Sequence, residues 1–151
     1  MIDLHHENLL KRFDELNEKC FYGSLRRPKI EVRTYRYYVG QFYYSGSGKK
    51  KQPRIIISDA FVFNDKTLTE ILTHEMIHYY LCENHKWGSG RHSWNFRREC
   101  RRIYCDYGIR VYATGKGVAL NKVVKRRPIP LYEKVLYYII RPFDLFYDRL
   151  C

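Results

Sequence analysis

The sequence predicts an α+β fold in which helices pack against a small antiparallel sheet. Apolar residues recur at helical spacing near the N-terminus, alternate with polar neighbours after residue 28, and return to helical spacing from about residue 68. Glycine and proline separate these segments and predict turns between them. A chain of 151 residues suits a single compact domain. We expect its core over about residues 3–118 and a C-terminal tail over about residues 119–151.

Residues 3–22 are predicted to form the first helix. Acidic residues lie near its start, and Gly23 stands where the helix is expected to end. The residues that recur at helical spacing, and so share one face, are Leu9, Phe13, Leu16 and Cys20.

Three strands are predicted in the following segment. Residues 30–34 alternate with charged neighbours, and the Tyr-rich run as far as Tyr38 also favours a strand. Gly40 then interrupts the run. Residues 41–45 and 54–58 are the next two strands, joined by a basic loop. We expect these strands to form the small antiparallel sheet.

Two or three further helices are predicted in the rest of the chain. Thr67 and Glu70 form the Ser/Thr-x-x-Glu pattern of a capping box, so a helix is expected from about residue 68 to residue 82. A third helix is expected over residues 93–104, with apolar residues on one face and arginines on the other. Residues 131–140 also have a helical pattern.

The chain is strongly basic, which favours a polyanionic partner. It has 28 Lys and Arg against 16 Asp and Glu, a formal charge of +12. Such a field attracts polyanions, so DNA is expected ahead of an anionic membrane surface or an acidic protein. A solvated helix face is the alternative interpretation of the arginine-rich stretch. The residues predicted to contact nucleic acid are Arg91, Arg97, Arg98, Arg101 and Arg102.

The sequence favours a cytoplasmic protein that does not enter a membrane, associated with the nucleoid if it is bacterial. Its N-terminus lacks the charged and apolar regions of a secretory signal peptide. The longest apolar stretch, residues 135–140, is far shorter than the roughly 20 residues that span a bilayer. The five cysteines include no C-x-x-C pair, which favours reduced thiols. A monomer is the default expectation.

The predicted second helix carries the sequence His74-Glu75-Met76-Ile77-His78. Residues four apart lie on one helix face with Cβ atoms about 5–6 Å apart, so His74 and His78 can hold one zinc ion. Glu75 lies about 100° further around the helix, where it can act as a general base. This pattern is typical of zinc-dependent hydrolases. Its alternative interpretation is a pair of hydrogen-bonded histidines on a core helix.

A catalytic zinc site needs a third protein ligand, and the sequence offers three candidates. His85 lies seven residues beyond His78, about 10 Å along a continued helix and too far to share the ion. Glu99 is a possible ligand from the third helix. His92 is the stronger candidate, because it follows a flexible Gly-Ser-Gly-Arg segment from which the chain can fold back.

Several segments, in this order, resemble those of SprT-like metallopeptidases. They are residues 17–25, the strand segment that ends at Gly40, the H-E-x-x-H motif, and residues 90–96, which begin Gly-Arg-His-Ser. The resemblance spans roughly residues 7–105. It differs at Ser93, where the family commonly has glycine, and in the tail, which lacks the paired cysteines of the zinc ribbon that many members carry.

The resemblance implies a zincin-like metallopeptidase fold, with the small sheet packed against the H-E-x-x-H helix. It also implies that His74, His78 and His92 hold zinc and that Glu75 is the catalytic base. The family includes proteases that degrade proteins crosslinked to DNA, so a role in DNA repair is expected.

The sequence therefore predicts a zinc-dependent endopeptidase that acts on DNA-associated or DNA-crosslinked proteins. Two alternatives stay open at this point. One is a non-catalytic DNA-binding protein with a structural zinc ion. The other is a zinc hydrolase of small amide substrates.

Overall fold

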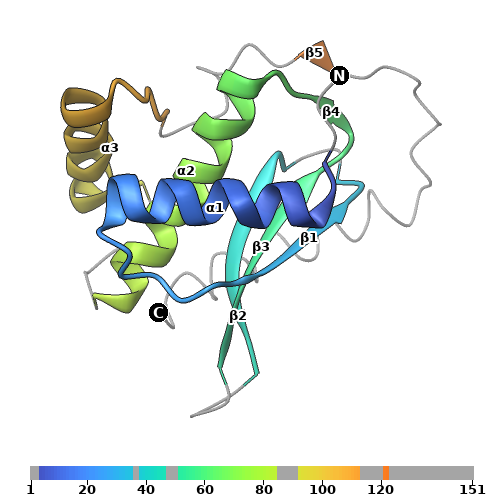
Figure 1. Ribbon diagram of the computed structural model, residues 1–151, viewed down its shortest axis with the longest axis horizontal. Coiled ribbons are helices and arrows are strands. Elements are labelled where there is room, and N and C mark those ends of the chain that lie inside the picture. Colours follow the sequence, from blue (N-terminus) through green and yellow to red (C-terminus); the bar gives the residue numbers. More distant parts are fainter. Residues whose placement is uncertain (1–3, 36–37, 47–50, 85–91, 113–120, 123–151) are drawn as a thin grey trace.

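Within the part of the chain that the structure describes, three helices pack with one another and with a small mixed sheet, which confirms the predicted α+β class (Figure 1). A short two-stranded sheet, β4 (Phe61–Val62) with β5 (Asn121–Lys122), was not predicted. The predicted helix over residues 131–140 lies outside the described residues. The computed structural model describes residues 4–35, 38–46, 51–84, 92–112 and 121–122.

Helix α1 (His6–Phe21) forms where the apolar periodicity predicts it. It ends because Tyr22 and Gly23 both take positive φ angles, of 59° and 64°. The side chain of Asn17 then holds the turn that follows. Its amide nitrogen donates to the carbonyl of Leu25 at 2.8 Å, and its oxygen accepts from the N–H of the same residue at 3.2 Å. These two hydrogen bonds fix the turn through which the chain passes from α1 to the sheet.

The main sheet contains β1 (Lys29–Arg33), β2 (Gly40–Ser45) and β3 (Gln52–Ser58), in the order β1-β3-β2. Strand β2 is antiparallel to β3, but β1 is parallel to β3. The prediction of a wholly antiparallel sheet was therefore wrong. Residues 55–57 of β3 are three buried isoleucines, and a strand that is apolar on both faces is stable in the centre of a sheet. Strand β3 therefore separates β1 from β2.

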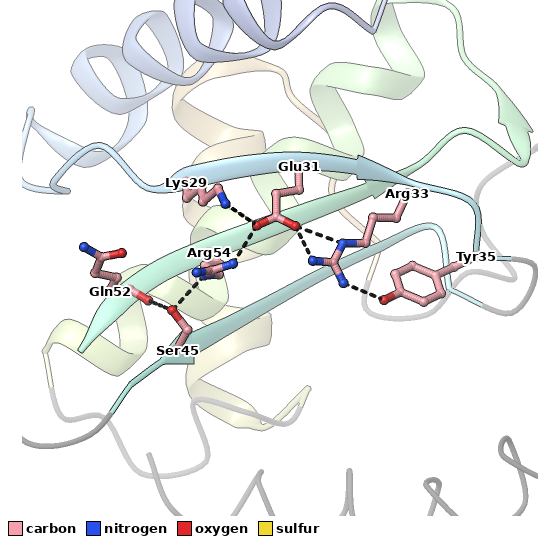
Figure 2. Close-up of polar contacts among 7 residues, drawn as sticks. All are labelled: Lys29, Glu31, Arg33, Tyr35, Ser45, Gln52 and Arg54. Carbon is pink, nitrogen blue, oxygen red and sulfur yellow. Dashed lines mark hydrogen bonds and ion pairs between the residues drawn. The ribbon is translucent and has the colours of Figure 1, made fainter. Parts of the chain in front are cut away.

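A cluster of charges on one face of the sheet connects all three strands (Figure 2). Glu31 of β1 accepts hydrogen bonds from Arg33 on its own strand and, at 2.7 Å, from Nη1 of Arg54 on β3. The Nε of Arg54 also donates to the hydroxyl of Ser45 on β2 at 2.7 Å. Hydrogen bonding to Arg33 lowers the pKa of Glu31 despite its partial burial. The side chains of Arg33 and Arg54 are therefore hydrogen-bonded to other residues of the sheet.

Helix α2 (Asp65–Glu83) starts three residues before the predicted position, and its cap is Asn64 rather than Thr67. The side-chain oxygen of Asn64 accepts from both the N–H and the hydroxyl of Thr67, each at 2.8 Å. Asn64 has an extended backbone, which a cap residue requires. Glu70, the other member of the predicted capping box, is buried instead. The capping box was therefore wrong, although the helix is present.

Helix α2 lies at the centre of the molecule and contacts β2, β3, α1 and α3 (Figure 1). The ring of Tyr79 on α2 stacks on the ring of Phe42 on β2, with centroids 5.0 Å apart. Apolar residues on several sides of α2 are fully buried, among them Leu72, Met76, Ile77 and Leu81. A helix that is apolar around most of its circumference is an interior helix.

Helix α3 (Trp94–Tyr107) packs against α2 and runs one turn further than predicted. It ends at Gly108, whose φ of 71° allows the left-handed cap. Ser93 precedes it in an extended conformation, but the hydroxyl makes no cap hydrogen bond. Within the described ranges, no helix is both long and apolar enough to cross a membrane.

Replacing Asn64 with alanine is expected to lower the free energy of unfolding by about 1 kcal/mol, because the first turn of α2 loses its cap. Urea unfolding followed by circular dichroism measures the change. Asn8→Ala, at an exposed position near the start of α1, is the control and should change this free energy by less than about 0.5 kcal/mol. Equal losses in the two variants would contradict the assigned cap.

Candidate metal centre

Helix α2 presents His74 and His78 on the same face, one turn apart. Their Nε2 atoms are 3.3 Å apart. The continuous helix from Asp65 to Glu83 fixes this spacing, because both residues belong to one run of helical backbone hydrogen bonds. The local geometry that the motif predicts is present.

His92 reaches the same point from the segment before α3. Its Nε2 lies 3.0 Å from Nε2 of His74, and the ligand atoms of all three histidines lie within 4.8 Å of one another. Glu99, the alternative third ligand, instead forms an ion pair with Arg102 at 2.7 Å. His85 lies outside the described residues. The structure thus brings together His74, His78 and His92 as a group able to hold a metal ion.

The distances between these nitrogens fit a zinc ion. Tetrahedral zinc with Zn–N bonds of about 2.0–2.1 Å has ligand atoms about 3.3–3.4 Å apart. Two of the nitrogen–nitrogen distances are 3.3 and 3.0 Å. The donor set of three imidazoles also occurs in catalytic zinc sites that keep a fourth position open.

The hydrogen bonding of His74 supports a cation at this point. Its Nδ1 lies 2.8 Å from the carbonyl oxygen of Tyr112, and because a carbonyl only accepts, Nδ1 carries the proton. Nε2 then has one lone pair, directed at the other two histidines. One lone pair cannot accept well from both His78 and His92, whereas a single cation satisfies all three nitrogens.

Phe96 supports the three imidazoles from the core side. Its ring is fully buried, and the ring centroid lies 4.9, 4.5 and 4.8 Å from the ring centroids of His74, His78 and His92. Burial, followed by the neighbouring histidines, lowers the pKa of His74 to about 3. Burial, and then the charge of Arg97, also lowers the pKa of His92. Both rings are therefore held neutral, which is the form that binds a metal ion.

Glu75 is directed toward the start of β2. It is buried, and a Cβ atom added at Gly40 would lie 2.8 Å from its Oε1. Burial raises the pKa of Glu75 to about 8, while a backbone hydrogen bond from Phe42 opposes this change. The absence of a side chain at Gly40 therefore leaves the space that the carboxyl group occupies.

A comparison with protein families matches residues 9–115 to the SprT-like family. The chain belongs to this family. The matched segment runs from α1 through α3 and includes all three clustered histidines and Glu75. A search of curated proteins gave no match. Membership agrees with the resemblance found in the sequence.

The arginines predicted to bind nucleic acid do not all lie on one exposed surface. Arg97, Arg98 and Arg101 are exposed on α3. Arg102 donates to Glu99 of its own helix and, at 2.8 Å, to the carbonyl of Cys20 on α1. Arg91 lies outside the described residues. Arg102 therefore connects two helices, and the exposed stripe is smaller than predicted.

Three contributors to the site were not predicted from the sequence. The carbonyl of Tyr112 is a backbone group, which every residue carries, so no sequence signal marks it. Phe96 and Gly40 lie in segments that resemble the family, but the sequence analysis gave neither residue a role at the site.

Replacing His92 with alanine is expected to weaken zinc binding on the order of 100-fold or more, because loss of an outer-shell partner alone typically costs 10- to 100-fold. The rise in melting temperature on adding zinc reports this affinity. His6→Ala, at an exposed position on α1, is the matched control and should respond to zinc as the unmodified protein does. An unchanged zinc response in His92→Ala would show that the ion is held elsewhere.

Proposed function

We propose that this protein is a zinc-dependent endopeptidase with a zincin-like fold. The observation that carries the proposal is the meeting of three imidazole nitrogens, two of them from the helix on which the buried Glu75 directly follows His74. His74, His78 and His92 hold the ion. Zinc bound by three histidines supplies electrophilic assistance to a carbonyl and lowers the pKa of water to about 7. SprT-like membership supports the same reaction class.

Glu75 takes the proton of the attacking water and gives it to the leaving amine. Its position directly after His74, about 100° around the helix, separates it from the metal ligands while keeping it at the same site. Contact with Gly40 and Phe42 of β2 holds the carboxyl group in one place. A fixed base of this kind is not required by a zinc ion that only stabilises a fold.

The sheet supports a peptide as the substrate. Strand β2 is at the edge of the order β1-β3-β2, and its first residue, Gly40, lies against Glu75. Among the described residues, no strand pairs with the outer edge of β2, and an extended peptide can add to such an edge as a further strand. A peptide bound there would run past the carboxyl group that the reaction needs.

The basic charge supports DNA-associated or DNA-crosslinked proteins as substrates. A formal charge of +12 brings the enzyme to nucleic acid, where such proteins are concentrated. A role in DNA repair follows from this location together with proteolysis.

Glu75→Gln is expected to lower peptide-bond cleavage by 100-fold or more, on the order of the contribution of a general base, while zinc binding is retained. The measurement is cleavage of a DNA-binding protein with and without DNA, paired with metal analysis. Glu70→Gln, at the other buried glutamate of α2, is the matched control and should stay active.

Each outcome of this experiment separates the candidate functions. Cleavage that survives in Glu75→Gln would exclude the assigned base. Zinc binding with no cleavage of any protein by the unmodified chain would favour a structural zinc ion. Hydrolysis of small amides alone would favour the small-substrate hydrolase.

Gly40→Ala is expected to lower cleavage on the order of 100-fold with zinc binding retained, because misplacing a reacting group by about 1 Å has this effect. The added Cβ would lie 2.8 Å from Oε1 of Glu75, so the carboxyl group must move. Initial cleavage rates and zinc content measure the two effects. Gln41→Ala, at the next position of β2, is the control, and an equal loss there would argue against a specific contact.

A further inference from the structure

Ser58 lies at the point where the chain crosses from one side of the main sheet to the other. It is the last residue of β3, the central strand, and it pairs with Arg33 at the end of β1. Strand β2 begins at Gly40 on the opposite side of β3. The two outer strands of such a sheet are about 9.5 Å apart, twice the spacing of neighbouring strands. The chain between β1 and β2 therefore has to cross the end of β3.

Ser58 holds both ends of this connection. Its hydroxyl accepts from the N–H of Tyr35 at 3.0 Å and donates to the carbonyl of the same residue. It also accepts from the N–H of Ala60 at 3.2 Å, in the turn after β3. These bonds use the donor and both lone pairs of the hydroxyl. The backbone N–H of Ser58 donates to the carbonyl of Val39 at 2.9 Å. One buried serine therefore fixes the backbone on both sides of the central strand.

The end of the connection that Ser58 fixes leads directly to Glu75. Val39 precedes Gly40, where an added Cβ atom would lie 2.8 Å from Oε1 and 3.1 Å from Cγ of Glu75, so this contact leaves no free space. A backbone hydrogen bond from Phe42 reaches the same carboxyl group. A shift in the start of β2 would therefore move both groups that hold the carboxyl group in place.

The two ends of β2 are attached to α2 in different ways. Near the end of the strand, the hydroxyl of Tyr44 donates to Glu83, and the ring of Tyr44 contacts that of Tyr79. Gly40 has no side chain with which to make such contacts. The start of β2 is therefore positioned by its pairing with β3 and by the hydrogen bonds of Ser58.

We infer that Ser58 is a positioning residue for Glu75. By fixing Tyr35 and Val39 on either side of β3, it sets where β2 begins and so where the strand meets the carboxyl group. Ser58 acts through β2. Its effect on cleavage rests on the proposed function, whereas its effect on the contact between β2 and Glu75 does not.

The test uses the full-length protein with Ser58 replaced by alanine or by cysteine. Alanine removes every hydrogen bond of the hydroxyl, whereas a thiol is a weaker donor and acceptor, so the cysteine variant should be intermediate. The control is Ser45→Ala at the other end of β2, where the lost hydroxyl accepts from Nε of Arg54 at 2.7 Å (Figure 2). All proteins are compared at a temperature at which circular dichroism shows them to be folded.

Hydrogen exchange of the Phe42 amide, followed by NMR in the presence of zinc, measures the contact between β2 and Glu75 without using cleavage. Ser58→Ala should accelerate this exchange about tenfold, because the contact opens more often when the start of β2 is released. Ser58→Cys should give a smaller increase. Ser45→Ala should leave the exchange of Phe42 within about twofold of the unmodified protein.

Steady-state cleavage of a DNA-binding protein measures the consequence for the reaction. Ser58→Ala should lower kcat about tenfold, less than the 100-fold that follows from misplacing a group by about 1 Å. KM should change by less than about twofold, because the remainder of β2 stays in place. The rise in melting temperature on adding zinc should be retained, since the three histidines are not affected. Ser45→Ala should retain kcat.

Two results would overturn the inference. One is exchange of the Phe42 amide that Ser58→Ala leaves unchanged or that Ser45→Ala accelerates equally, which would indicate general loosening of the sheet. The other is faster exchange in Ser58→Ala with an unchanged kcat. Either result leaves the peptidase proposal standing. If the unmodified chain cleaves no protein, that proposal fails, but the exchange measurements still decide whether Ser58 positions Glu75.

Discussion

The burial of α2 on several sides is the constraint on which the rest of the structure depends. Tyr79 packs on the sheet, while other apolar residues of the helix face α1 and α3. An interior helix cannot rotate without exposing apolar surface, so the directions of its polar residues are fixed as well. The two histidines and Glu75 therefore keep their directions because their apolar neighbours are buried. The core and two of the three histidines of the candidate metal centre therefore belong to the same helix.

The neighbours of α2 complete the site from three directions. The segment before α3 supplies His92, the chain after α3 supplies the carbonyl of Tyr112, and β2 contacts Glu75. Phe96 closes the side toward the core. Each contribution is a single contact from a different element, so the site depends on how these elements pack rather than on any one of them.

The arginines of this basic protein serve different purposes in different places. Arg33 and Arg54 on the sheet share Glu31, so that Arg54 joins β3 to β1, and Arg102 joins α3 to the end of α1. Those on the outer side of α3 lie beside exposed rings. Net charge alone cannot separate these groups, because the distinction lies in whether a carboxylate or a carbonyl is within reach.

The sequence by itself determined the positions of the three main helices and of the main strands, because local periodicity and turn residues report them. It also determined that His74 and His78 share a helix face, since a regular helix fixes that relation. It did not determine the parallel pairing of β1, because strand direction depends on which strand takes the centre of the sheet. The cap at Asn64 was not predicted, because asparagine and threonine both suit a cap position and the backbone conformation of the folded chain decides between them.

Only the tertiary structure decided between His92 and Glu99, brought the carbonyl of Tyr112 to His74, and turned Arg102 inward while Arg98 stayed outside. These are contacts between segments distant in sequence, or to backbone groups that all residues share. Spacing along the chain carries no information about them, because they arise only when the elements pack together.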